Sequence, residues 1–102
     1  MIEIKLPESI KVGGYDYAVI LSAGRSADLK HQNLWGEARH GSFRDISIDV
    51  DAPPQEFTNT VIHEITHSIC KVYGVDLGES QVTVMANGLH QVFEQLGIRF
   101  IR

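Results

Sequence analysis

Hydrophobic and polar residues alternate in the first half of the chain, and the pattern changes to a helical period in the second half. In the segment FRDISIDV, residues 43–50, isoleucine and valine alternate with aspartate and serine, which is typical of a half-buried strand. From the segment DAPPQEF onward, prolines and then apolar residues at helical spacing replace this alternation. The order predicts strands first and helices afterwards.

Two further segments have the composition of strands. The segment IKVGGYDYAVIL, residues 10–21, places two β-rich runs on either side of Gly13 and Gly14. Paired glycines supply the positive φ angles of a two-residue turn, so this segment predicts a β-hairpin. The segment LWGEAR, residues 34–39, is a weaker candidate because Gly36 interrupts it.

The first helical segments are marked by their flanking residues. The polar segment SADLKHQN, residues 26–33, predicts one or two helical turns with Ser26 as the N-cap. Pro53 and Pro54 suit the first turn of a helix, and a longer helix is predicted from about residue 54 to 73, with its end at Gly74.

A second long helix is predicted over residues 78–96, with its end at Gly97, and residues 98–102 form a short extended tail. The whole chain, residues 1–102, then forms a single domain of the α+β class. We expect a small antiparallel sheet of about three strands, followed by two packed helices.

Composition narrows the possible partners. The chain has 102 residues, of which 43% are hydrophobic and 22% charged, as in ordinary globular domains. Its net charge of −4 argues against nucleic acid or an anionic membrane as a partner. The single cysteine, Cys70, excludes an internal disulfide and fits a reducing compartment. With neither a long apolar run nor a secretion signal, we expect a cytoplasmic protein.

The segment VIHEITHSIC, residues 61–70, carries the strongest chemical signal. His63 and His67 are one helical turn apart, about 40° from each other around the helix axis, so both imidazoles can bind one ion. Glu64 lies about 60° further round, where a carboxylate can act on a metal-bound water. An isolated histidine is more often an ordinary surface or core residue, but the pair with its glutamate favours a metal site.

A hydrolytic zinc site usually has three protein ligands and an open fourth position. Glu79, at the start of the second long helix, is the candidate third ligand. The connector of residues 74–78 is long enough to bring the chain back beside His67. Alternatively, Asp76 and Glu79 form a capping box, in which the glutamate accepts a hydrogen bond from a helix-end N–H group.

Other histidines and the cysteine are weaker candidates. Cys70 returns to nearly the same face as the histidine pair, although a lone cysteine is more often a small buried hydrophobe. His90 lies about 16 Å along the helix from Glu79, too far to share its ion, but it can line a cleft. His31 and His40 lie in polar segments without a partner pattern.

With these residues the chain resembles a very small gluzincin-type HExxH metallopeptidase. It is most similar to the short HExxH proteins encoded by bacterial viruses and prophages, which are related in style to ImmA/IrrE-type and SprT-like proteins. The resemblance runs from Val12 to Gly97, through the segments GGYDYAV, DISIDV, TVIHEITHSI and ESQVTVMANGLHQVFEQLG. HExxH is the specific motif; the other segments match in spacing and residue type.

The resemblance implies zinc as cofactor, with His63, His67 and Glu79 as ligands and Glu64 as general base. It also implies a peptide or protein substrate, which would pair with the strand of residues 43–50 at the edge of the cleft. Family members often carry a second acidic residue after the ligand glutamate, where this chain has Ser80.

We therefore expect zinc-dependent hydrolysis of peptide bonds. The alternative is a binding or regulatory phage protein in which zinc stabilises the fold and nothing is cleaved. Hydrolysis also needs a donor to the oxyanion, for which Tyr73, His90 and Arg99 are all candidates.

Overall fold

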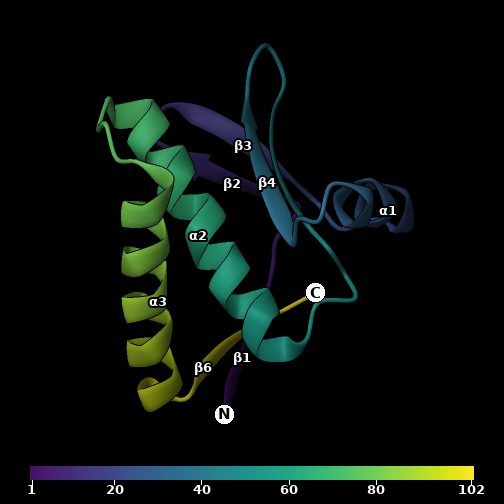
Figure 1. The fold of residues 1–102 in the computed structure, drawn as a ribbon, viewed down its shortest axis with the longest axis vertical. Helices are drawn as coiled ribbons and strands as arrows, with labels where there is room; N and C mark the ends of the chain where they lie inside the picture. The colour runs from purple at the N-terminus through teal and green to yellow at the C-terminus, as the bar shows by residue number, and fades with distance from the viewer.

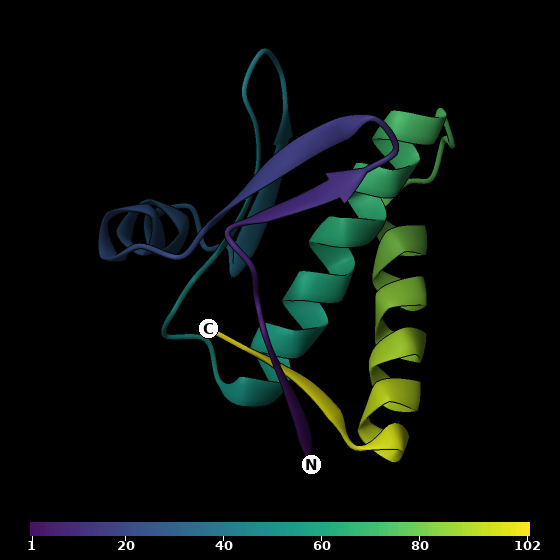
Figure 2. The ribbon, with the colours of Figure 1, turned by 180° about the vertical axis from the view of Figure 1, so that it is seen from behind.

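The computed structural model describes residues 1–102 and contains three helices and six strands in two sheets. In chain order the elements are β1 (Ile2–Lys5), β2 (Ser9–Val12), β3 (Tyr15–Ile20), α1 (Ala23–His31), β4 (Gly36–His40), β5 (Arg44–Ile48), α2 (Pro54–Tyr73), α3 (Glu79–Leu96) and β6 (Ile98–Ile101). Figures 1 and 2 show their arrangement from opposite sides. The chain is α+β, but the predicted layout of three strands followed by two helices is wrong.

The main sheet has four strands in the order β2-β3-β5-β4 and is mixed rather than antiparallel. The predicted hairpin is confirmed, because β2 and β3 pair antiparallel around a turn in which Gly13 has a φ of 58°. The strand β5 pairs parallel with β3 and antiparallel with β4. A parallel pair needs a crossover connection, and here α1 and β4 supply it.

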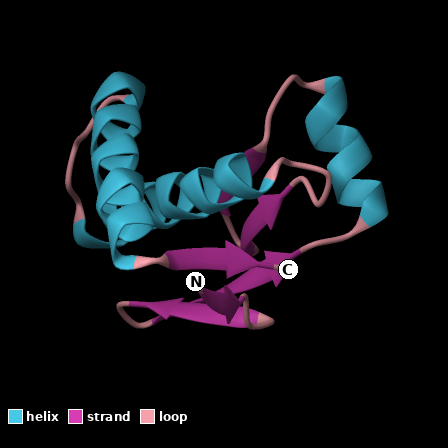
Figure 3. Cartoon of the chain, turned by 90° about the horizontal axis from the view of Figure 1, so that it is seen from below, coloured by secondary structure: helices cyan, strands magenta, loops and turns pink.

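Helices cover both faces of this sheet. Ile46 and Ile48 of β5 point into the hydrophobic core with Phe57 and other residues of α2. The alternate residue Ser47 points to the other face, where its Oγ accepts a hydrogen bond of 3.0 Å from Nε of Arg25 on α1. In Figure 3 the α2–α3 pair and α1 lie on opposite sides of the view, with strands between them.

The helix α1 begins earlier than predicted. Its N-cap is Ser22, whose Oγ accepts a hydrogen bond of 3.1 Å from the backbone N–H of Arg25. Ser26, the predicted cap, is buried in the helix, and its Oγ accepts a hydrogen bond of 3.0 Å from the backbone N–H of Val50. The prediction of Ser26 as N-cap is therefore wrong, because this serine connects α1 to the segment that follows β5 instead.

The helices α2 and α3 confirm the two predicted long helices. Gly74 and Gly97 end them in the left-handed conformation, with φ angles of 68° and 72°. The two helices pack side by side, joined by a short connector at the top of Figure 1. No helix of the protein combines the length and the apolar character that a membrane span requires.

The two ends of the chain form the second sheet. The strand β1 pairs parallel with β6, with Ile2 opposite Ile98, so the predicted extended tail is a strand with a partner. The backbone N–H of Phe100 donates a hydrogen bond of 3.1 Å to Oγ1 of Thr58, which connects this sheet to α2. The sequence interpretation did not include β1.

Candidate metal centre

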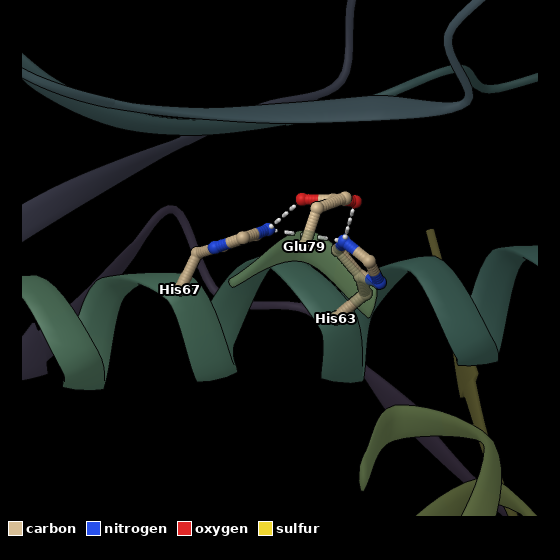
Figure 4. A group of neighbouring side chains, drawn as sticks. All are labelled: His63, His67 and Glu79. Carbon is tan, nitrogen blue, oxygen red and sulfur yellow. Dashed lines mark hydrogen bonds and ion pairs between the residues drawn. The ribbon is translucent and has the colours of Figure 1, made fainter. Parts of the chain in front are cut away.

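Three side chains from two helices point toward one another at the candidate site (Figure 4). His63 and His67 lie one turn apart on α2, and Glu79 is the first residue of α3. The Nε2 atoms of both histidines lie 2.8 Å from the Glu79 carboxylate, each next to a different oxygen. The two Nε2 atoms are 3.1 Å apart. The structure thus brings together the three residues predicted as zinc ligands.

Hydrogen bonds alone do not satisfy this geometry. If both Nε2 atoms carry protons, both rings can donate to Glu79, but the two N–H groups then face each other at 3.1 Å. If one Nε2 lacks its proton, a lone pair faces the carboxylate at 2.8 Å. A cation accepts all three lone pairs at once, and a tetrahedral zinc site holds its ligand atoms roughly 3.3 Å apart. Two imidazoles and one carboxylate therefore fit zinc, with a fourth position for water or substrate.

The start of α3 leaves the Glu79 side chain free to act as a ligand. Gly78 is the N-cap, and its backbone N–H donates a hydrogen bond of 2.8 Å to Oε1 of Gln81. The returning side chain of a capping box is thus that of Gln81. The predicted alternative, in which Glu79 caps this helix together with Asp76, is wrong.

Glu64 lies beside the ligands but does not join them. Its side chain is buried, with 7% of the residue exposed, between α2 and β4. Burial raises the pKa of its carboxyl group to about 7, and the negative charges of Glu79 and Glu37 act in the same direction. A hydrogen bond from the backbone N–H of Ala38 opposes the rise. This carboxyl group can therefore gain and lose a proton near neutral pH.

The three candidate ligand residues line two pockets. A pocket of about 360 Å³ is lined by Glu64 and His63, and by Gly36 at the start of β4. A second pocket of about 400 Å³ is lined by His67, and by His40 at the end of β4. One pocket adjoins each end of β4, and we call the two pockets together the β4 groove.

The strand beside the site is not the predicted one. The segment 43–50 contains β5, which has β3 on one side and β4 on the other, so both of its edges are already paired. The free edge of the sheet near α2 belongs to β4, residues Gly36–His40. The prediction that the strand of residues 43–50 pairs with a peptide is wrong for this reason.

None of the three predicted oxyanion donors lines the β4 groove. Tyr73 lies at the exposed end of α2 beside Gly13. His90 and Arg99 both face Glu94, at 3.4 and 3.8 Å. Cys70 lines the pocket next to His67, but it is not in the group of ligand atoms that lie within 4.8 Å of one another.

Sequence reasoning missed His40. Its Nδ1 lies 2.9 Å from the hydroxyl oxygen of Tyr17. Burial lowers the pKa of the His40 ring, and the positive charge of Lys71 lowers it further. Twenty-three residues separate His40 from Tyr17, so no local spacing signals the pair. Pairing of both β3 and β4 with β5 brings the two residues together.

Comparison of the chain with protein-family models, with curated proteins and with solved structures found no match. Its resemblance to small HExxH metallopeptidases therefore stays a prediction. Function has to be inferred from the side chains of the site and their geometry.

Proposed function

We propose that the protein is a zinc-dependent metallopeptidase that hydrolyses peptide bonds. The observation that carries this proposal is the convergence of His63, His67 and Glu79 beside a buried carboxyl group that does not coordinate with them. Two histidines and a glutamate are a known ligand set of hydrolytic zinc, and the extra glutamate supplies the proton chemistry.

Each part of the site has a distinct role in this reaction. When bound, zinc lowers the pKa of water and polarises a carbonyl group. Glu64 takes the proton of the attacking water and passes it to the leaving amine, a task that suits a carboxyl group with a pKa of about 7.

The β4 groove supports an extended peptide as the substrate. A strand with a free edge can pair with a peptide through backbone hydrogen bonds, and β4 offers such an edge. The candidate ligands line both pockets, so both pockets could receive side chains of a peptide that passes over these residues. The metal ligands would then lie beneath the middle of the bound segment.

Two variants test the separate roles of base and ligand. Glu64→Gln should keep one zinc per chain and lose hydrolysis, whereas His63→Ala should lose both. The assays are elemental analysis of the purified protein and detection of new amino termini in a peptide library, with and without a chelator. Glu3→Gln in the exposed strand β1 is the charge-matched control and should behave like the wild type. Equal zinc loss in the Glu64 and His63 variants would contradict these roles.

One observation favours a second function, in which zinc only stabilises a binding module. Val82 and Ala86 are the only buried residues of α3, so a metal bridge to α2 would add much to the attachment of this helix. Under this alternative, the protein carries stoichiometric zinc and releases no new amino termini. The peptide-library assay above separates the two functions.

A further inference from the structure

The proposed hydrolysis lacks one component in the site described so far. As water adds to the carbonyl carbon, negative charge develops on the carbonyl oxygen, and preorganised donors stabilise it. Glu64 cannot do this, because it has to accept a proton. A further donor in the β4 groove would share this task with the bound metal ion.

We propose that His40 donates its Nε2–H to the carbonyl oxygen of the substrate, and that Tyr17 fixes His40 in the tautomer that can do so. This inference rests on the proposed function. In it His40 is a catalytic residue, since it touches the reacting group, and Tyr17 is a positioning residue.

The buried hydroxyl of Tyr17 decides the tautomer. Tyr17 is fully buried, and the only hydrogen-bond partner of its hydroxyl group is Nδ1 of His40, at 2.9 Å. A buried O–H group needs an acceptor, so the hydroxyl donates and Nδ1 supplies the lone pair. In the neutral ring the single proton must then be on Nε2. The opposite tautomer would leave the Tyr17 proton without an acceptor at a cost of about 1–3 kcal/mol.

The contact with Tyr17 also restricts the orientation of the imidazole. The two rings meet edge to face, with 5.7 Å between centroids and an interplanar angle of 71°. The hydrogen bond and the ring contact act on the same side chain, so the His40 ring has little freedom to rotate. Preorganised donors of this kind stabilise developing charge better than mobile ones, because they need no reorganisation during the reaction.

The position of His40 along the groove suits this role. It is half-buried at the end of β4 and lines the same pocket as His67. Glu64 lines the other pocket, near the start of β4. A carbonyl group placed over the metal ligands would thus have the base on one side and His40 on the other. Lys71 also lines the His40 pocket, but its side chain is exposed and no contact fixes its position.

Kinetics of zinc-loaded variants test the catalytic role. The substrate is the peptide that the wild type cleaves fastest in the library assay. His40→Ala should lower kcat by about 10²- to 10³-fold with KM and zinc content nearly unchanged. His40→Gln retains an N–H donor and should recover part of that loss. His31→Ala removes an exposed histidine of α1 and is the matched control, expected to leave kcat unchanged.

The positioning role is tested independently of turnover. Nitrogen-15 NMR of the metal-free wild type should show His40 protonated on Nε2 and unprotonated on Nδ1. Tyr17→Phe should yield a mixture of tautomers and lower kcat roughly tenfold or more. Tyr15→Phe, on the same strand but exposed, should change neither quantity.

The outcomes separate this inference from the proposed function. Peptide cleavage by the wild type, with His40→Ala folded and fully active, would overturn the inference alone. Protonation on Nδ1 in the wild type would overturn the role of Tyr17. A zinc-loaded wild type that cleaves no peptide would overturn the proposed function, and the catalytic role of His40 with it.

Discussion

At the scale of single residues, Glu64 links the chemistry of the site to the stability of the metal-free protein. Its carboxyl group has a pKa of about 7 in the folded chain, against an ordinary value of 4.5. Between these pH values the folded state binds more protons than the unfolded state. The contribution of this carboxyl group to the free energy of unfolding is therefore greatest below about pH 4.5. It falls as the pH rises through about 7.

Glu64→Gln should remove this dependence, because glutamine does not titrate. A pKa difference of this size corresponds to about 3 kcal/mol, so the metal-free variant should gain up to that amount over the wild type at pH 8. At pH 4 the two should differ little. Urea unfolding in the presence of a chelator measures both values, with Glu3→Gln as control. Parallel pH profiles for wild type and Glu64→Gln would contradict the burial of a titrating carboxyl group.

The residues of the candidate site differ in how far the sequence could predict them. The helical period alone places His63 and His67 on one face, and the connector length brings Glu79 within reach. Nothing local connects His40 with Tyr17, since their contact requires the register of two strands that both pair with β5. Sequence reasoning thus identified the side chains held by helices and missed those held by the sheet.

At the scale of elements, Gly36 determines how closely β4 approaches α2. A Cβ atom at this position would lie 2.5 Å from Cγ2 of Thr60 and 2.9 Å from the backbone oxygen of Ser47. Any side chain here would have to push β4 and α2 apart. In the sequence, this glycine weakened the prediction of a strand; in the structure, it permits the contact that forms one end of the β4 groove.

Gly36→Ala should therefore cost about 1–3 kcal/mol of stability, as overpacking does. It should also lower peptide hydrolysis, since β4 has to move, but keep zinc binding, since all three ligands come from α2 and α3. Urea unfolding, the peptide assay and elemental analysis give the three values. Gly88→Ala on α3, where a Cβ meets nothing within 4 Å, is the control and should stabilise the protein slightly. Loss of zinc in Gly36→Ala would contradict the independence of ligands and strand.

The helices and strands differ in how accurately the sequence predicts their bounds. The two long helices were predicted nearly to the residue, because proline marks the start of α2 and glycine marks the end of both. The start of α1 was misplaced because Ser22 and Ser26 are both chemically suitable caps, and only the burial of Ser26 distinguishes them. The strand β1 was missed because its partner β6 lies at the other end of the chain.

At the scale of the whole molecule, α3 is held to the rest of the protein by few buried residues. Four of its large apolar residues are exposed, namely Met85, Leu89, Val92 and Leu96. These side chains therefore add little to the attachment of α3. The contacts of α3 with α2 include a hydrogen bond of 2.8 Å between Asn59 and Asn87, and the ligand group at Glu79. A metal ion in that group would join the two helices at one end.

Zinc should therefore stabilise the whole fold and not only the site. At a free zinc concentration of 100 times Kd, the expected gain is about 2.7 kcal/mol. For a chain of this size, that gain raises Tm by roughly 10 to 20 °C. Glu79→Gln should abolish most of the zinc-induced shift, while Glu94→Gln, further along the same helix, should retain it. Thermal unfolding of the three proteins, with zinc and with chelator, measures the shift. An equal shift in Glu79→Gln would mean that zinc binds without joining α2 to α3, because Glu79 is the only ligand that α3 contributes.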